Sequence, residues 1–205
     1  MKMTALEKLL VNREAKSLGN IKQLDAVLAD MDTSGVHDVL EIGCGNGIVS
    51  AHLCGEHWMN VTGVDIDPAQ IDLARQRFGE HRGLRFAAAE AERLPQADAQ
   101  FDLVIAQNAF HHIVGWKDAL GEVARVLRPG GMFIWQDFAV TPWVQRLLSP
   151  FSRYAGVYTL ADVRGTLAQA GVFQRRHQQR LAGPVARHLL VLEKLRSWPA
   201  PLSPA

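Results

Sequence analysis

Short apolar runs alternate with segments of helical periodicity along most of the chain. The runs at 39–42, 61–64, 84–87, 101–106 and 132–135 have the length and composition of buried strands. Between them, apolar residues recur every three or four positions, which predicts helices over 48–57, 68–78 and 116–127. Strands that alternate with helices in this way indicate an α/β fold, with an open, mostly parallel sheet and helices on both of its faces.

The two ends of the chain differ from this middle region. Residues 4–31 have apolar positions at helical spacing, and Gly19-Asn20 is expected to divide them into two helices. The first helix would pack on the domain, cover a pocket or lie on a membrane surface, and simple packing is favoured over membrane contact. Residues 141–159 are apolar and aromatic but contain two prolines, a pattern too irregular for a plain helix. A last helix is predicted over 159–171, and 172–173 and 185–195 are expected to form two closing, antiparallel strands.

The first strand runs directly into a glycine-rich turn. Gly43, Gly45 and Gly47 stand at alternate positions, with Glu41 just before them and a predicted helix just after them. Glycines let a ligand approach the main chain, and the start of the helix offers unpaired N–H groups and its positive dipole end. The turn therefore indicates a nucleotide-type site, although a tight turn without a ligand has the same pattern. The G-x-G-x-x-G spacing of dinucleotide enzymes is absent, because position 48 is Ile.

Further candidate residues follow the second and fourth strands. Asp65 ends the second strand, about twenty positions beyond the glycines, where an acidic side chain accepts hydrogen bonds from ribose hydroxyls. Asp67-Pro68 is suited to cap the next helix. Gln107, His111 and His112 follow the fourth strand, and such positions face the crevice where open α/β sheets bind ligands. A histidine can take a proton from a hydroxyl nucleophile near neutral pH, and it can equally line a pocket without any chemistry.

The turn E-x-G-x-G-x-G over 41–47 resembles the first motif of class I S-adenosylmethionine-dependent methyltransferases, of the methyltransferase domain 11-like type. The segment Leu127-Arg128-Pro129-Gly130-Gly131 and the His-His pair are similar to segments of the small-molecule and lipid-quinone members. The resemblance covers residues 37–137 with specific motifs and 159–195 weakly. It implies a Rossmann-like, seven-stranded, mostly parallel sheet with an antiparallel last strand, and S-adenosylmethionine as cofactor, with S-adenosylhomocysteine as product.

The resemblance also implies roles for individual residues. The methionine part of the cofactor would be held by Glu41 and the turn that contains Gly43, Cys44, Gly45 and Gly47. Asp65 would hold the ribose, with Ile66 beside it. Glu90, which stands where the family has Asp, and the backbone of Ala91 would hold the adenine, while Glu92 is expected to be a solvated charge. Gln107 would lie near the sulfonium, and His111 is preferred over His112 as a catalytic base, because it is nearer to the end of its strand.

The expected acceptor is a small, apolar or aromatic, lipid-like molecule. In the resembling enzymes the insertion after the fifth strand selects the acceptor, and the lining of this insertion, residues 138–158, offers little to pair with a charge. An Asn-Pro-Pro-Tyr motif is missing after the fourth strand and the net charge is only +1, so nucleic acid is not expected as a partner. No metal site is expected, because Asp and His residues do not cluster as ligands. The acceptor atom (O, N, C or S) and the oligomeric state do not follow from the sequence.

The 205 residues fit one domain. We place this domain at 1–197, with 1–32 as a helical lid or cap, 138–158 as the acceptor-side insertion and 198–205 as a mobile tail. The absence of a signal-peptide pattern and of a long apolar run favours a cytoplasmic protein with Cys44 and Cys54 reduced. A basic C-terminal region would be a solvated face or touch anionic lipids; its residues are Arg175, Arg176, Arg180, Arg187, Lys194 and Arg196.

Two other functions remain open. A nicotinamide-dependent oxidoreductase would also use a glycine-rich turn, but the missing third glycine and the segment at 127–131 argue against it. A protein that binds S-adenosylmethionine without catalysis would have the same cofactor motifs and differ only in its acceptor pocket.

Overall fold

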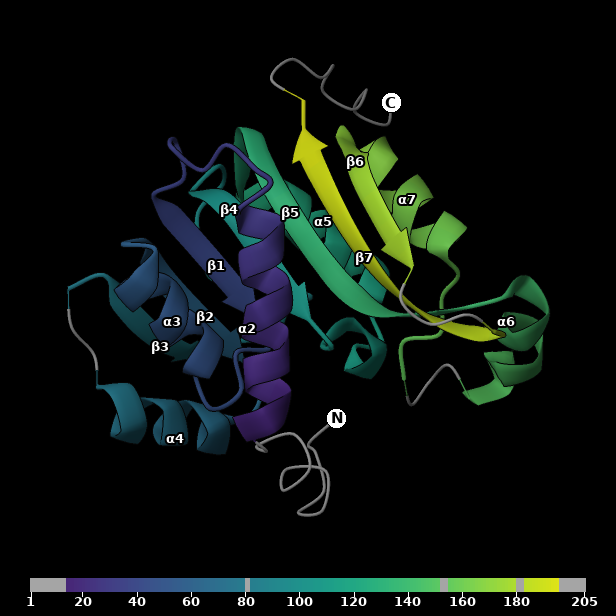
Figure 1. The fold of residues 1–205 in the computed structure, drawn as a ribbon. Coiled ribbons are helices and arrows are strands. Elements are labelled where there is room, and N and C mark those ends of the chain that lie inside the picture. The colour runs from purple at the N-terminus through teal and green to yellow at the C-terminus, as the bar shows by residue number, and fades with distance from the viewer. Residues whose placement is uncertain (1–13, 80–81, 152–154, 180–182, 196–205) are drawn as a thin grey trace, which may run out of the picture.

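A computed structural model describes residues 14–79, 82–151, 155–179 and 183–195 of the chain. Seven strands form one sheet in the order β3-β2-β1-β4-β5-β7-β6 (Figure 1). Strands β1 to β5 are parallel, and β7 is antiparallel to both of its neighbours, β5 and β6. The predicted sheet with one reversed strand is therefore confirmed. The strands are β1 (Asp38–Ile42), β2 (Asn60–Asp65), β3 (Leu84–Ala88), β4 (Phe101–Gln107), β5 (Leu127–Val140), β6 (Val172–Gln179) and β7 (Val185–Lys194).

Helices cover both faces of the sheet. On one face α2 (Glu14–Leu28), α3 (Ile48–Glu56) and α4 (Pro68–Phe78) bury Leu24, Leu53 and Ile71 against the strands. On the other face α5 (Trp116–Val126) and α7 (Leu160–Gln169) bury Leu120 and Leu167. Neighbouring strand residues alternate between the two cores, so the central strands are apolar at nearly every position, as the sequence runs indicated.

The N-terminal helix corrects one prediction. Helix α2 continues through Gly19 and Asn20, which were expected to divide it. Glycine within a helix costs about 1 kcal/mol relative to alanine, so the local signal is weak. Tertiary contacts offset this cost, because Leu24, Val27 and Leu28 are buried on α2. Residues 1–13 of the expected lid and the expected tail at 198–205 lie outside the described residues.

The segment after the fifth strand also differs from the prediction. Strand β5 extends beyond the apolar run 132–135 in both directions, from Leu127 to Val140, and its residues 138–140 pair with β7. Part of the expected insertion therefore belongs to the sheet. It is followed by helix α6 (Pro142–Leu148), with Pro142 in its first turn, where a missing N–H costs nothing, and then by the short 3-10 helix η2 (Ser149–Phe151). A plain helix thus forms where an irregular segment was expected.

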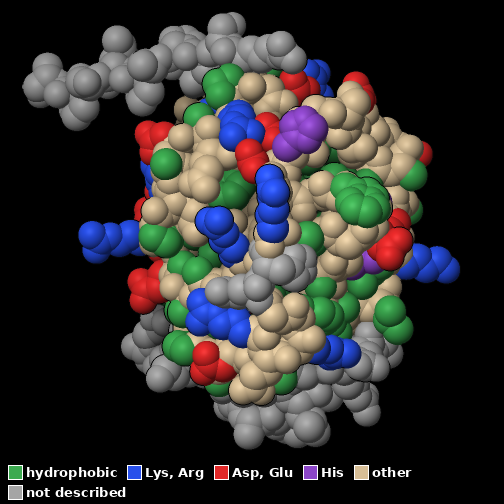
Figure 2. Space-filling view, turned by 90° about the vertical axis from the view of Figure 1, so that its left-hand side faces the viewer, with side chains coloured by type: hydrophobic (Ala, Val, Ile, Leu, Met, Phe, Trp, Pro, Cys, Tyr) green, Lys and Arg blue, Asp and Glu red, His purple; other side chains and the backbone are tan. Residues whose placement is uncertain are grey.

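One side of the molecule carries charges of both signs. Figure 2 looks onto the side formed by β3, α3 and α4, where Lys and Arg side chains lie among Asp and Glu side chains. Charges of both signs on one face are typical of a solvated surface.

Among the described residues, none of the helices combines the length and the apolar character needed to cross a bilayer.

Candidate cofactor and active site

Two adjoining cavities lie at the carboxyl ends of β1, β2 and β4, where the strand order reverses between β1 and β4. The larger has a volume of about 300 Å³ and the smaller one of about 70 Å³. They share Gly43, Gly45 and Asn108 in their walls, so they form one continuous site. The larger cavity is completed mainly by Asp65, Ile66, Asp67, Glu90, Ala91, Glu92, Ala109, His112, Ile113 and Val114, and the smaller by Ser17, Asn20, Glu41, Cys44, Asn46, Val49 and Gln107.

The glycine turn is shaped by close approach and by left-handed backbone. Gly43 has φ +76°, and a Cβ atom there would lie 2.6 Å from the Cβ of Ala109. Gly45 also has a positive φ, and Gly43 N–H and Cys44 N–H both donate to the carbonyl of Val64 on β2. Gly47 is in the wall of neither cavity; it starts α3 and packs so tightly that a Cβ would lie 2.8 Å from both Ala74 and Phe86. The structure therefore shows Gly47 in helix packing, and its predicted contact with a ligand stays a prediction.

Asp65 links the glycine turn to the helix after β2. Its Oδ2 accepts a hydrogen bond from Gly45 N–H at 3.0 Å, and its Oδ1 accepts one from Asp67 N–H at 2.9 Å. Asp67 in turn caps α4 by accepting from Ala69 N–H, as predicted. Asp65 lines the larger cavity, and a carboxylate oxygen can accept more than one hydrogen bond. The carboxylate is thus oriented by the backbone for hydroxyl groups of a ligand.

Glu41 is the buried acid of the smaller cavity. Only 4% of its surface is exposed, and Ser50 Oγ donates a hydrogen bond to its Oε2. Burial raises the pKa of Glu41 to about 7, against the Ser50 hydrogen bond and with the nearby charge of Asp65 adding to the rise. Such a carboxyl group is costly to ionise until a cation is placed beside it. Its environment therefore favours a ligand that carries a positive charge.

Gln107 supplies a second acceptor in the smaller cavity. Its Nε2 donates to the carbonyl of Asn20 on α2 at 3.2 Å and to Gln136 Oε1 at 3.3 Å. Its Oε1 is buried and has no hydrogen-bond partner among the described residues. A buried acceptor without a donor costs about 1–3 kcal/mol, so a ligand that donates there would remove a penalty. Cys44 lies beside it with a buried thiol whose pKa is raised well above its usual value by burial, and then by Glu41 and Asp65.

The residues expected at the adenine side line the larger cavity. Ile66, 46% exposed, and Ala91, buried, offer apolar surface, and Glu90 is exposed at the rim. Glu92 corrects the prediction of a solvated charge: it is half-buried, lines the cavity and accepts a hydrogen bond from Gly115 N–H at 3.3 Å. The turn that joins these residues is held by Glu122, which accepts from Leu94 N–H.

The two histidines occupy different places in the 3-10 helix η1 (Phe110–His112). His112 lines the larger cavity, whereas His111 is next to it, and the centroids of the two rings are 3.9 Å apart. His111 Nδ1 lies 2.6 Å from Oδ1 of Asp137, a carboxylate on β5 that is 1% exposed. Asp137 also accepts hydrogen bonds from the backbone N–H groups of Phe110, His111 and Phe138. Since Asp137 acts as an acceptor throughout, the proton belongs on Nδ1 of His111 and the lone pair on Nε2.

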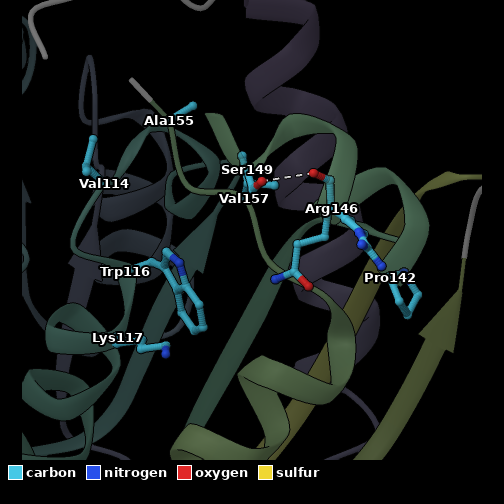
Figure 3. Close-up of a pocket in the computed structure, with 9 residues that line it drawn as sticks. Val114, Trp116, Lys117, Pro142, Arg146, Ser149, Ala155 and Val157 are labelled. Carbon is cyan, nitrogen blue, oxygen red and sulfur yellow. Dashed lines mark hydrogen bonds between the residues drawn. The ribbon is translucent and has the colours of Figure 1, made fainter. Parts of the chain in front are cut away.

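An open groove of about 630 Å³ adjoins the larger cavity at Val114. Figure 3 shows Trp116 and Lys117 on its α5 side and Pro142 and Arg146 on its α6 side. The expectation that the lining of the insertion offers little to pair with a charge is therefore wrong, because Arg146 and the neighbouring Lys117 are cations. Apolar and cationic side chains together suit an apolar molecule with a polar or anionic end.

The sequence analysis did not assign a role to several residues of the site. Asn108 directly follows β4 and Asp137 lies within β5 beside it, so the available signal was their position near the carboxyl edge of neighbouring strands. The basic C-terminal region also needs correction. Lys194 donates to the carbonyls of Ala124 and Leu127, and Arg175 pairs with Glu193, so these cations are not one solvated face. The side chains of Arg176, Arg180 and Arg196 lie outside the described part of the chain.

Comparison with known proteins agrees with this geometry. Residues 40–135 match the family described as methyltransferase domain. The O-methyltransferase cnsE of Penicillium expansum is 32% identical over 141 residues, which are 65% of this chain and 51% of cnsE. The phthiotriol/phenolphthiotriol dimycocerosates methyltransferase of Mycobacterium tuberculosis is 41% identical over 106 residues, 50% of this chain and 38% of that protein. Residues 40–135 therefore form a methyltransferase domain of the class I S-adenosylmethionine-dependent type.

The chain spans about half or less of the length of these two relatives. Its fold is also that of the YcgJ protein from Bacillus subtilis, with a TM-score of 0.70 at 18% sequence identity, over 85% of this chain and 98% of YcgJ. At this level of identity the structural likeness establishes the fold alone.

The cofactor of the family, S-adenosylmethionine, fits the residues of the site. Its ammonium group matches the buried carboxyl of Glu41 and the unpaired Gln107 Oε1, which need a cation and a donor. Gly43 and Gly45 line both cavities and carry no side chain, so a ligand can lie against the main chain there. Asp65 presents acceptors for ribose hydroxyls, and Ile66 and Ala91 present apolar surface for a base.

Proposed function

We propose that this chain transfers the methyl group of S-adenosylmethionine to a hydroxyl oxygen of a small, apolar or aromatic, lipid-like acceptor. The observation that carries the proposal is the His111–Asp137 pair beside the glycine-lined cavity, 2.6 Å apart. A histidine held in this way can accept the proton of a hydroxyl group, and oxygen is the acceptor atom that most needs such help. The O-methyltransferase among the relatives supports the same assignment.

When bound, the cofactor would supply a methyl group already activated by a sulfonium cation. The chain would hold it through Glu41, Gln107 and the glycine turn at one end and through Asp65 and the Glu90–Glu92 segment at the other. Asp137, whose Oδ1 lies 2.6 Å from Nδ1 of His111, would fix the ring and favour the tautomer with its proton on Nδ1. His111 Nε2 would then take the acceptor proton, and Asp137 stabilises the imidazolium that results. Holding acceptor and donor in line can contribute several kcal/mol of the barrier.

The groove between α5 and α6 is the proposed entrance for the acceptor. Trp116 and Val157 would contact its apolar body, and Lys117 and Arg146 would contact a polar or anionic substituent. The name of the mycobacterial relative, a methyltransferase of phthiotriol and phenolphthiotriol lipids, is in line with a large apolar acceptor.

The first experiment is calorimetric titration of the purified protein with S-adenosylhomocysteine and, separately, with NADH. We expect binding of the first ligand only. Transfer of isotopically labelled methyl from S-adenosylmethionine is then measured with a panel of phenols, quinols and hydroxylated lipids, beside the matching ethers or deoxy compounds. Product with the hydroxyl compounds alone would support the proposal.

A histidine variant separates catalysis from binding. His111→Ala should lower kcat by about 10²–10⁴ and leave the affinity for S-adenosylhomocysteine unchanged, whereas His37→Ala, on the exposed loop before β1, should change neither. Full turnover by His111→Ala would refute the base. Tight S-adenosylhomocysteine binding with no product from any acceptor would favour a binding protein without catalysis, and NADH binding alone would favour an oxidoreductase.

A further inference from the structure

Three ligand-type side chains meet on the face of α2 that packs against α3, at residues outside the cavities of the cofactor site. Asp25 comes from α2, His52 from α3, and His57 from the C-cap position directly after α3. The Nε2 atoms of His52 and His57 lie 2.8 Å and 3.0 Å from the same atom, Oδ1 of Asp25. All three ligand atoms lie within 4.8 Å of one another. The expectation that Asp and His do not cluster is therefore wrong for this group.

The surroundings suit a bound cation. The three side chains are half-buried, and the two rings meet edge-on with centroids 5.4 Å apart, so both nitrogens point to one place. Both imidazole nitrogens approach Oδ1 of Asp25, so one carboxylate oxygen and two imidazole nitrogens are available to a single ion.

We propose that Asp25, His52 and His57 bind a divalent transition metal ion of the zinc type, with water completing its coordination. Two imidazoles and one carboxylate are a common ligand set of Zn²⁺, and ligands at bonds of about 2.0 Å lie about 3.3 Å apart in a tetrahedral site. The present separations of 2.8 Å and 3.0 Å have to open by only a few tenths of an ångström.

Such an ion would join α2 to α3, which pack side by side (Figure 1). On α2, Asn20 stands five residues before Asp25 and contacts Gln107 and Asn108 in the wall of the cofactor site. The metal would therefore fix the helix that closes the smaller cavity. It would act as a structural clamp at a distance from the reaction, without contact to cofactor or acceptor.

The test uses the full chain without an affinity tag, freed of metal with EDTA and then of EDTA. Zn²⁺ is titrated calorimetrically, and Co²⁺ is followed by its visible absorption. We expect one equivalent of Zn²⁺ to bind and to raise the unfolding temperature, and Co²⁺ to give the bands of a four- or five-coordinate ion without a thiolate charge-transfer band. His52→Gln, His57→Gln and Asp25→Asn should each weaken binding at least tenfold, and the exposed His37→Gln should not.

The outcomes are separate from those of the methyl-transfer proposal, because metal binding is measured without cofactor or acceptor. Absence of saturable Zn²⁺ binding to the unchanged protein would overturn the site and leave a His–Asp–His hydrogen-bonded group. Equal binding by His52→Gln, His57→Gln and Asp25→Asn, or a thiolate band with Co²⁺, would place the ion elsewhere and overturn it as well. Unfolding temperatures of the variants in EDTA identify any variant that does not fold.

Discussion

Replacement of Glu41 by Gln tests the electrostatics of the cofactor site in the ligand-free protein. Glu41 is buried, and its pKa is raised to about 7, chiefly by burial. The amide of glutamine has nearly the same shape and still accepts the hydrogen bond from Ser50 Oγ. It carries no charge at any pH. The substitution therefore removes the cost of ionising a buried carboxyl group and little else.

The expected effect on stability depends on pH. In the unfolded chain the pKa of Glu41 is near its ordinary value of 4.5, so between pH 4.5 and about 7 the folded protein retains a proton that the unfolded chain has lost. The free energy of unfolding of the unchanged protein therefore falls as pH rises through this window. A rise of the pKa from 4.5 to about 7 corresponds to about 3 kcal/mol. Glu41→Gln should gain about this much stability over the unchanged protein between pH 4 and pH 8.

The assay is urea unfolding of both proteins at several pH values, with the difference between them plotted against pH so that all other titrating groups cancel. Glu56→Gln, at the exposed end of α3, controls for the loss of one negative charge. A difference that stays within about 1 kcal/mol from pH 4 to pH 8 would refute the reasoning, because it would mean that Glu41 ionises in the folded protein without cost.

Ligand binding gives a second readout of the same group. An ammonium group beside Glu41 favours the ionised carboxyl, so binding of S-adenosylhomocysteine near pH 6.5 (about half a unit below the raised pKa) should release part of a proton to the buffer. Calorimetry in buffers of different ionisation enthalpy measures this release. Glu41→Gln should abolish the release and weaken the binding. Unchanged proton release in the variant would place the titrating group elsewhere.

Three further substitutions test the remaining contacts. Gly43→Ala should weaken S-adenosylhomocysteine binding and lower the free energy of unfolding by about 1–3 kcal/mol, because φ of Gly43 is +76° and a Cβ there would be too close to Ala109. The control is Gly121→Ala in α5, where the space around the glycine is open. In urea unfolding this control should stabilise the protein by up to about 1 kcal/mol. Asp65→Ala should weaken S-adenosylhomocysteine at least tenfold in calorimetry, about 1.4 kcal/mol, and an unchanged affinity would contradict its ribose role. Asp137→Asn should lower kcat at least tenfold and alter its pH profile with little change in cofactor affinity, and an unaltered profile would separate Asp137 from proton transfer.

Most of the fold could be predicted from the local pattern of apolar and polar residues. Apolar runs of strand length, separated by helical periodicity, located all seven strands, because strands buried on both faces need apolar residues at nearly every position. The errors lie where tertiary contacts outweigh local preference. Gly19-Asn20 reads as a break, yet Asn20 accepts hydrogen bonds from Gln107 and Asn108, and the next turns of α2 bury leucines in the core. Such contacts cannot be seen within a window of neighbouring residues.

The site was predictable only in part for a related reason. Glu41, the glycines and Asp65 belong to short motifs in which sequence neighbours are also neighbours in space. Asp137 and His111 are 26 positions apart, and they meet because β4 and β5 pair in parallel, with Gln107 opposite Gln136. The pairing of adjacent parallel strands could have suggested this contact, whereas the meeting of Asp25 with His52 and His57 requires the packing of α2 on α3.

Asn108 shows how these separate elements become one site. Its backbone has φ +56°, a conformation that costs a non-glycine residue about 1–3 kcal/mol. The cost is offset by the hydrogen bond from its N–H to the carbonyl of Gln136 at 2.7 Å and by the bond from its Nδ2 to Asn20 Oδ1 at 3.2 Å. The resulting sharp turn sets Ala109 against Gly43 and starts η1, which carries both histidines. The strained residue therefore connects the cofactor turn, helix α2 and the proposed base. Through these contacts, a movement of α2 would change the position of His111.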